Sequence, residues 1–267
     1  MNITIGQYYP TDSVIHKLDA RVKIIGTFLY IAAIFIAKGI VGYLLSILML
    51  AAVIQLSRVP VKMLLNGLKA IIVIIVFTVA LNIFFTPGER ILWQYGVIKI
   101  SVEGILTAVK LAVRLILLIM GSSILTLSTT PIQLTVGMEY LLKPFKKIGV
   151  PAHEIAMMTS IALRFIPNLV EELDKIRKAQ MARGADFDTG GLVKKAKSLI
   201  PLLVPLFVSA FRRADELAMA MEARCYRGDV NRTRMNEPVL EKSDYTALFI
   251  MTAFMLLILA IRLIWGL

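Results

Sequence analysis

The sequence predicts an all-α polytopic membrane protein, with about five transmembrane helices and a cytoplasmic domain of long helices. Its 267 residues are 58% hydrophobic and have a mean hydropathy of +0.76, which is more apolar surface than a soluble domain can bury. Apolar runs long enough to cross a bilayer, or nearly so, recur along the chain. The long segment before the last run has helical spacing of its hydrophobic residues and no strand alternation.

Five apolar runs are the predicted spans, and Lys38-Gly39 predicts a tight turn between the first two, which are short. Basic residues cluster before the first run and between the second and third, whereas the 87–104 loop balances its charges. The positive-inside rule therefore places the N-terminus and the 57–67 loop in the cytoplasm and the 87–104 loop outside. The runs lie at 22–37, 40–56, 68–86, 105–127 and 245–265.

The chain is basic, with 30 Lys and Arg against 18 Asp and Glu and a formal net charge of +12. The basic residues sit beside apolar runs, as cytoplasmic anchoring requires, so the predicted partner is the lipid bilayer and no nucleic acid. The single cysteine, Cys225, excludes an intrachain disulfide framework. No cleavable signal is expected, because the N-terminus lacks a short apolar region followed by a small-residue cleavage site.

Three regions are predicted: an N-terminal membrane region with four transmembrane helices at 1–127, a cytoplasmic helical region at 128–243 and a C-terminal transmembrane helix at 244–267. In the middle region, the sequence predicts four helical segments. Its stretch LIPLLVPLFVSAF, at 199–211, is too short to cross and predicts a buried or interfacial helix. The segments open at Thr130-Pro131, at Pro151, at Pro167 and after Gly190-Gly191, and the last is interrupted at Pro201 and Pro205.

Two basic residues, Lys110 and Arg114, lie four apart within the fourth predicted span and so share one helix face. Lys110 is near the outer end, where its side chain can reach the interface. Arg114 is deeper, and the sequence predicts that it pairs with backbone carbonyls or with a neighbouring chain.

A short pattern of alanine, arginine and a small residue closes two predicted helices, at 182–184 and at 223–225. The arginines lie 224 − 183 = 41 residues apart, and upstream positions match, for example Asp174 with Asp215. Arginine projects five donors, and a cation at a helix C-terminus gains about 0.3–1 kcal/mol from the helix dipole. One copy is an ordinary helix cap, but two copies favour a pair of docking ends that insert into grooves on a partner.

These residues resemble the transmembrane T-component of energy-coupling factor transporters. The segment VPLFVSAFRRADELAMAMEARCYRG at 204–228, followed by Arg232-Thr233, is similar to the coupling region of that family. The stretch SVIHKLDARVK at 13–23 is similar to its N-terminal signature, and the resemblance covers essentially the whole chain.

The resemblance implies a non-catalytic scaffold with long coupling helices in an ABC-type importer for vitamins or transition-metal ions, with no cofactor or metal site of its own. Two cytoplasmic ABC ATPase subunits would each receive one helix end, and a separate membrane protein, the S-component, would hold the substrate. The protein would lie in a prokaryotic inner or plasma membrane, with the N-terminus and 128–243 cytoplasmic. The ATPase-docking residues would be Ala182, Arg183, Gly184, Ala223, Arg224 and Cys225.

Cys225 departs from the family pattern, which usually has glycine at this position. A non-glycine residue in the left-handed conformation costs roughly 1–2 kcal/mol. The sequence therefore predicts that the second helix continues for about a turn and is capped by Gly228. This would place Arg227 on the same face as Arg224 and add it to the docking residues. Cys225 is expected to be a small buried residue with no redox role.

Methionines on the same helices predict the contact with the S-component, because a flexible thioether suits a surface that accepts several partners. Filling gaps in helix packing is the other role open to them. The candidates are Met157, Met158, Met219 and Met221, with Met181 nearby.

The permease subunit of a conventional ABC transporter is the alternative, since Glu222-Ala223 with Gly228 weakly resembles the coupling loop of such permeases. Those permeases usually offer one coupling element per subunit, whereas this chain has two. A membrane-anchored adaptor without transport is a further possibility. An intramembrane enzyme is disfavoured, because His153-Glu154 lacks the second histidine of the zinc-protease spacing and no glycine-rich phosphate loop is present.

Overall fold

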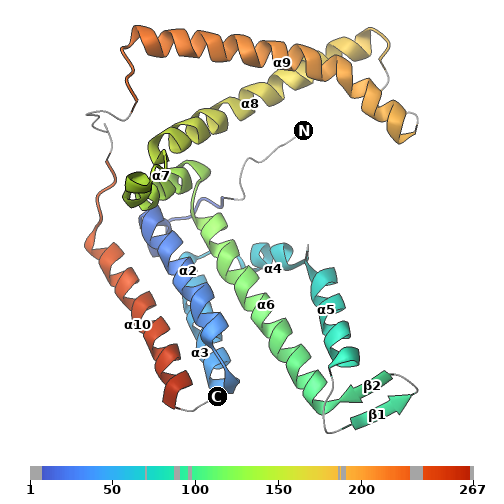
Figure 1. Ribbon diagram of the computed structural model, residues 1–267, viewed down its shortest axis with the longest axis vertical. Helices are drawn as coiled ribbons and strands as arrows, with labels where there is room; N and C mark the ends of the chain where they lie inside the picture. Colours follow the sequence, from blue (N-terminus) through green and yellow to red (C-terminus); the bar gives the residue numbers. More distant parts are fainter. Residues whose placement is uncertain are drawn as a thin grey trace. The chain divides into compact units, whose positions relative to one another are not determined.

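The computed structural model describes residues 8–69, 71–86, 91–95, 98–185, 187, 191–228 and 237–264, with the backbone alone for 91–95, 98–100 and 192–196. Helices make up nearly all of the described chain, with one two-stranded hairpin (Figure 1). The predicted all-α polytopic membrane fold is confirmed. The chain forms two compact units: Met1–Gly137 with Glu237–Leu267, and Met138–Asn236.

The first unit contains the helices that correspond to the predicted spans. Of the described helices, α3, α6 and α10 are long and apolar enough to cross a membrane, and α4 with α5 would make a fourth across a bend. With 17 residues, α2 is shorter and stays a predicted span. The helices are α1 (Val14–Lys17), α2 (Ala20–Ile36), α3 (Gly39–Ser57), α4 (Val61–Lys69), α5 (Ile72–Phe85), α6 (Val102–Ser128) and α10 (Lys242–Ile264).

The region between α3 and α5 differs from the prediction of a loop at 57–67 followed by one straight span. Arg58 takes a left-handed conformation, with φ +53°, and ends α3. The short helix α4 then forms and ends at Lys69, so the predicted span at 68–86 is broken. The physical reason is Leu64, which is fully buried in the core of the first unit and holds α4 in place.

The predicted loop at 87–104 contains a short hairpin, in which β1 (Ile91–Tyr95) pairs antiparallel with β2 (Ile98–Ser101). Ser101 then begins α6, because its Oγ accepts a hydrogen bond from the amide of Gly104 at 3.0 Å. Residues 87–90 and 96–97 of this loop lie outside the described residues.

Helix α2 supplies the centre of the apolar core and packs against α6 and α10. The ring of Tyr30 stacks on that of Phe254 from α10, with centroids 6.4 Å apart. The core therefore joins α2, near the start of the unit, to α10 at its end. Its buried members include Tyr30, Ala33, Ile34, Leu64, Leu117, Ile124, Phe254 and Ile258.

The two basic residues of α6 lie in different surroundings. Lys110 is exposed. The guanidinium carbon of Arg114 lies 5.9 Å from the ring centroids of both Phe35 and Tyr43, which are cation–π contacts. Among the described residues, no backbone carbonyl accepts from it as expected, and its predicted pairing with a neighbouring chain stays a prediction.

The second unit contains two long helices, α8 and α9. The described part of 128–243 forms fewer and longer α-helices than the four helical segments predicted there. Helix α7 (Pro131–Leu142) is followed by the 3₁₀ helix η1 (Lys143–Ile148). Helix α8 (Ala152–Ala182) then runs through Pro167, and α9 (Leu192–Ala223) runs through Pro201 and Pro205. Each proline removes one backbone hydrogen bond, but the packing of α8 against α9 keeps both helices continuous.

Candidate functional site

The C-terminal end of α8 carries the first predicted tripeptide. The helix ends immediately before Arg183, and Gly184 takes the left-handed conformation at φ +86°. The Gly184 amide donates to the Met181 carbonyl at 2.9 Å, and the Ala185 amide donates to the Gln180 carbonyl at 2.9 Å. This pair of bonds is the Schellman motif, which satisfies carbonyls that a helix end otherwise leaves open.

The C-terminal end of α9 repeats this arrangement. The Cys225 amide donates to the Glu222 carbonyl at 2.8 Å, and the Tyr226 amide donates to the Met221 carbonyl at 3.0 Å. Arg224 holds the position that the arginine of the first tripeptide holds on α8. The two helix ends are therefore built alike, although only one of them has glycine in the left-handed position.

The expected extension of α9 to Gly228 is wrong. Cys225 itself adopts the left-handed conformation, at φ +55°, and the cap bonds offset its cost of roughly 1–2 kcal/mol. Arg227 therefore lies beyond the helix and shares no helical face with Arg224. Cys225 is exposed, which also corrects the expectation that it is buried.

A matched pair of variants tests this account of the two ends. We expect Cys225→Gly to stabilise the end of α9 and Gly184→Ala to destabilise the end of α8, each by about 1 kcal/mol. A Cβ at Gly184 would meet no atom within 4 Å, so the cost is that of the backbone alone. Hydrogen exchange of the Tyr226 and Ala185 amides measures both effects. Unchanged exchange at both amides would contradict the account.

The tripeptides are open to a partner. Within the described parts of the chain, no hydrogen bond or ion pair engages the guanidinium group of Arg183 or of Arg224. Each arginine therefore keeps its donors available at a helix C-terminus, where its charge is favourable. The exposed docking candidates are Ala182, Arg183, Gly184, Ala223, Arg224, Cys225 and Arg227.

An ion pair joins α8 to α9 at positions that the tripeptides make equivalent. Nη2 of Arg213 lies 2.7 Å from Oε2 of Glu172, and 213 − 172 = 41, the offset that also separates the two arginine ends. Each end lies 11 residues beyond this pair (183 − 172 = 11 and 224 − 213 = 11), or about 16 Å along a helix. Figure 1 shows the helices crossing, with their C-terminal ends on opposite sides. Contact between equivalent positions is typical of an approximate twofold relation.

Helix α9 also presents an exposed apolar face, named here the α9 apolar face. Its residues recur every three or four positions, and Phe211 is 69% exposed. Of the two alternatives predicted for 199–211, a buried helix does not hold for most of this stretch, although Leu202 and Ser209 are buried, whereas an interfacial helix stays a prediction. The face consists of Leu199, Ile200, Leu203, Val204, Phe207, Val208 and Phe211.

The four methionines predicted for the S-component contact differ in exposure. Met158 and Met219 are exposed, the latter at 62%. Met157 and Met221 are half-buried, which suits a role in helix packing as well.

Reasoning from the sequence missed the ion pair between Glu172 and Arg213. It expected apolar faces of these helices to hold the S-component, but it did not identify the residues of the α9 apolar face. A signal for the ion pair was present, because opposite charges lie at the same 41-residue offset as the tripeptides. The signal for the apolar face was the helical spacing of its residues, which two prolines obscured.

Comparison with known proteins agrees with the resemblance found in the sequence. Residues 11–235 match the CbiQ family, described as cobalt transport protein. Three similar relatives are named energy-coupling factor transporter transmembrane protein EcfT. The protein of Thermosediminibacter oceani is 53% identical over 253 residues, which is 95% of both chains. That of Acidaminococcus fermentans is 50% identical over 99% of this chain and 98% of its own, and that of Bacillus subtilis 47% over 91% and 92%.

Proposed function

Because the chain belongs to the CbiQ family and is a transmembrane component of an energy-coupling factor transporter, we propose that it transmits ATP-driven motion from two ATPase subunits to a substrate-binding S-component. ATP hydrolysis is assigned to the partner subunits. The family description names cobalt, and the proposed substrate class for this chain is vitamins or transition-metal ions.

The observation that carries the proposal is the pair of like arginine ends on two crossed helices of one chain. Each end has the same cap bonds, and each arginine lies the same number of residues beyond its partner in the Glu172–Arg213 pair. Two similar ATPase subunits related by a twofold axis would meet two similar ends in this way. The arginines would form charge-assisted hydrogen bonds to acidic groups in a groove of each subunit.

Movement would pass through the crossing of α8 and α9. ATP binding brings two ATPase subunits together, and if each grips one helix end, the crossing angle of the helices must change or the helices must slide. Long helices that are tied at one ion pair can move as rigid levers, which supports this role for the α8–α9 pair.

We assign the S-component to the α9 apolar face together with the exposed Met158 and Met219. A contiguous exposed apolar face indicates an interaction site, and methionine adapts to partners of different shape. Met157 and Met221 would support this contact from half-buried positions.

The proposed topology follows from the distribution of charge. The N-terminus and the region 128–243 would be cytoplasmic, with membrane regions at 1–127 and 244–267, in a prokaryotic inner or plasma membrane. The hairpin of β1 and β2 would then lie on the outer side.

Purification of the tagged chain from its own membranes, followed by native mass spectrometry, tests the assembly. We expect one copy of this chain with two ATPase subunits and a small membrane protein. A Met158→Glu and Met219→Glu variant should lose the small membrane protein and keep the ATPase subunits, because a charge placed on an apolar contact costs several kcal/mol. Two copies of this chain per two ATPase subunits would contradict the proposal and favour the conventional permease.

A further inference from the structure

The N-terminal signature at 13–23 has no role in the docking ends, yet it lies at both junctions between the membrane helices and the cytoplasmic region. The segment between α6 and α10 begins and ends in the first unit, and its central part, Met138–Asn236, forms the second unit. Residues 9–24, named here the N-terminal clasp, contact the chain at each of these places.

At the exit junction, the clasp holds the C-terminal end of α6. The Lys23 ammonium donates to the carbonyls of Ser128 and His16, each at 3.0 Å, and the Tyr9 amide donates to the Leu127 carbonyl at 2.9 Å. Lys23 is only 8% exposed, so these carbonyls replace the water that its charge would otherwise bind. A cation at this point also offsets the negative end of the α6 dipole.

The clasp contacts the start of α7 as well. A Cβ added at Gly137 would lie 3.0 Å from the Cβ of Ala20 and 3.2 Å from Cδ1 of Ile24. These distances are shorter than ordinary Cβ contacts, so a larger residue at Gly137 would require Ala20 or Ile24 to shift by a few tenths of an ångström. The clasp therefore holds the end of α6 by hydrogen bonds and contacts α7 by packing.

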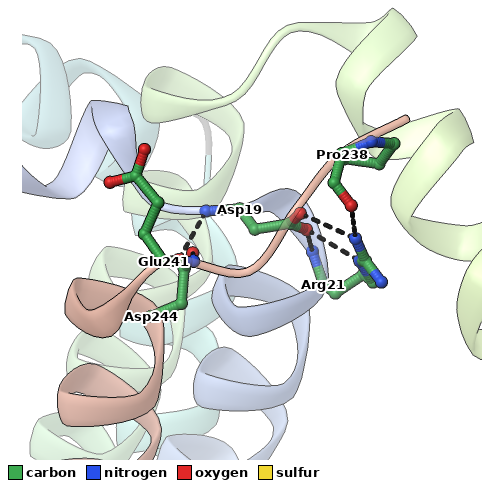
Figure 2. A network of polar contacts seen from close by, with 5 residues as sticks. All are labelled: Asp19, Arg21, Pro238, Glu241 and Asp244. Atoms are coloured by element: carbon green, nitrogen blue, oxygen red, sulfur yellow. Dashed lines mark hydrogen bonds and ion pairs between the residues drawn. The ribbon is translucent and has the colours of Figure 1, made fainter. Parts of the chain in front are cut away.

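At the return junction, Arg21 joins the clasp to the incoming chain, as Figure 2 shows. Its Nη2 donates to the Pro238 carbonyl at 2.6 Å and to Oδ2 of Asp19 at 3.1 Å, while its Nε donates to Oδ1 of Asp19 at 3.2 Å. The forked contact with one carboxylate fixes the plane of the guanidinium group. Arg21 is thereby aimed at the backbone of the returning segment.

Asp244 completes the return junction. One carboxylate oxygen accepts from the Asp19 amide at 2.8 Å, and the other accepts from the Glu241 amide at 2.9 Å (Figure 2). Asp19 precedes α2 and Glu241 precedes α10, so a single negative charge serves the N-termini of two helices. The side chain is 3% exposed.

The clasp is itself held in shape by local hydrogen bonds. Nε2 of His16 donates to the Tyr9 carbonyl at 3.0 Å, and its Nδ1 accepts from the Ser13 hydroxyl at 2.6 Å. Burial lowers the pKa of His16, which favours the neutral ring in which Nδ1 is an acceptor.

We propose that the N-terminal clasp positions both ends of the cytoplasmic region, with Arg21 and Lys23 as positioning residues for coupling. Movement of α8 and α9 can reach the membrane helices only if the segments that connect them are held in a fixed position. The clasp provides such an attachment at α6 and at α10 together, and α2 carries it into the core of the first unit. The inference rests on the proposed function, because it gives the motion of α8 and α9 a route into the membrane helices.

Hydrogen exchange of the purified complex, with and without ATP and vanadate, tests the proposal through Arg21→Ala. In the parental complex we expect nucleotide to change exchange at 152–182 and also at 241–246, by about fivefold or more. In Arg21→Ala the change at 241–246 should fall below about twofold, while that at 152–182 and the rate of ATP hydrolysis stay parental. The matched control is Lys17→Ala, an exposed cation of the same segment that pairs with Asp12 at 3.8 Å and touches neither junction.

A parental response at 241–246 in Arg21→Ala overturns the proposal, as does a parental complex in which that segment never responds. If the alanine variant does not assemble, Arg21→Gln keeps a polar side chain but is too short to reach the Pro238 carbonyl and loses the ion pair with Asp19, and the same result is required of it. Failure of both variants to assemble, with Lys17→Ala intact, would assign Arg21 to folding alone and overturn the proposal too. A parental complex without ATPase subunits would instead contradict the proposed function.

Discussion

The double variant Arg183→Glu with Arg224→Glu is expected to lose the ATPase subunits on purification, with binding weakened at least about 100-fold. Each reversal removes the charge-assisted hydrogen bonds of one helix end and sets a carboxylate against the acidic groups proposed for the groove. Losing one partner of a desolvated charge pair typically costs about 2–5 kcal/mol, so two ends exceed the required loss. Quantitative pull-down against a dilution series of the ATPase subunits measures the change.

The matched control is Arg212→Glu, which makes the same charge change at an exposed position of α9 away from its end. This control should bind the ATPase subunits as the parent does, since a surface charge change far from a contact costs little. Because the two ends have the same cap bonds, each single reversal should weaken binding to a similar extent. Retention of both ATPase subunits by the double variant would exclude the arginine ends as docking sites.

Asp244→Ala is expected to lower the free energy of unfolding of the first unit by about 3 kcal/mol. The substitution leaves the amides of Asp19 and Glu241 without their acceptor in a buried place, and it removes the charge that both helix N-termini share. The free energy of unfolding of Asp244→Asn should lie between those of the parent and of Asp244→Ala, because the asparagine side chain keeps one acceptor oxygen but replaces the other with a donor NH₂ group. The midpoint of thermal unfolding in detergent, followed by circular dichroism, measures the loss.

Ser243→Ala serves as the control for Asp244→Ala, since Ser243 is the exposed neighbour on the same helix turn. It should unfold at the parental temperature. If Asp244→Ala also unfolded at the parental temperature, water or a neighbouring group would have to replace the carboxylate as acceptor. This would contradict the expectation based on the burial of Asp244, which is 3% exposed.

The membrane helices were largely predictable, because apolar runs report burial in lipid directly. The errors fall where local sequence and packing disagree. Helix α4 was expected to be a loop, because the polar Lys62, Asn66 and Lys69 hide a short helix whose one buried residue, Leu64, fixes it. Pro167 predicted the start of a new helix, and Pro201 and Pro205 predicted interruptions, yet contact between α8 and α9 maintains both helices through these prolines.

At the docking ends, the motif predicted which segments end a helix, but three-dimensional contacts determined where the second helix stops. The repeated tripeptide identified both helix ends, but a rule against non-glycine residues in the left-handed conformation moved the second end to Gly228. The structure satisfies the cap with Cys225 in place. No local rule predicts the bond from Arg21 to Pro238, which joins residues 217 apart in sequence.

The carboxylate of Asp244 has a consequence for how the protein is made. Its acceptor role for the Asp19 amide spans 225 residues, so the N-terminus of α2, an early helix of the chain, obtains this bond from one of the last segments to be synthesised. At common rates of translation this delay is about 10 to 45 s. Until Asp244 has been synthesised, the Asp19 amide must donate to another acceptor, such as water.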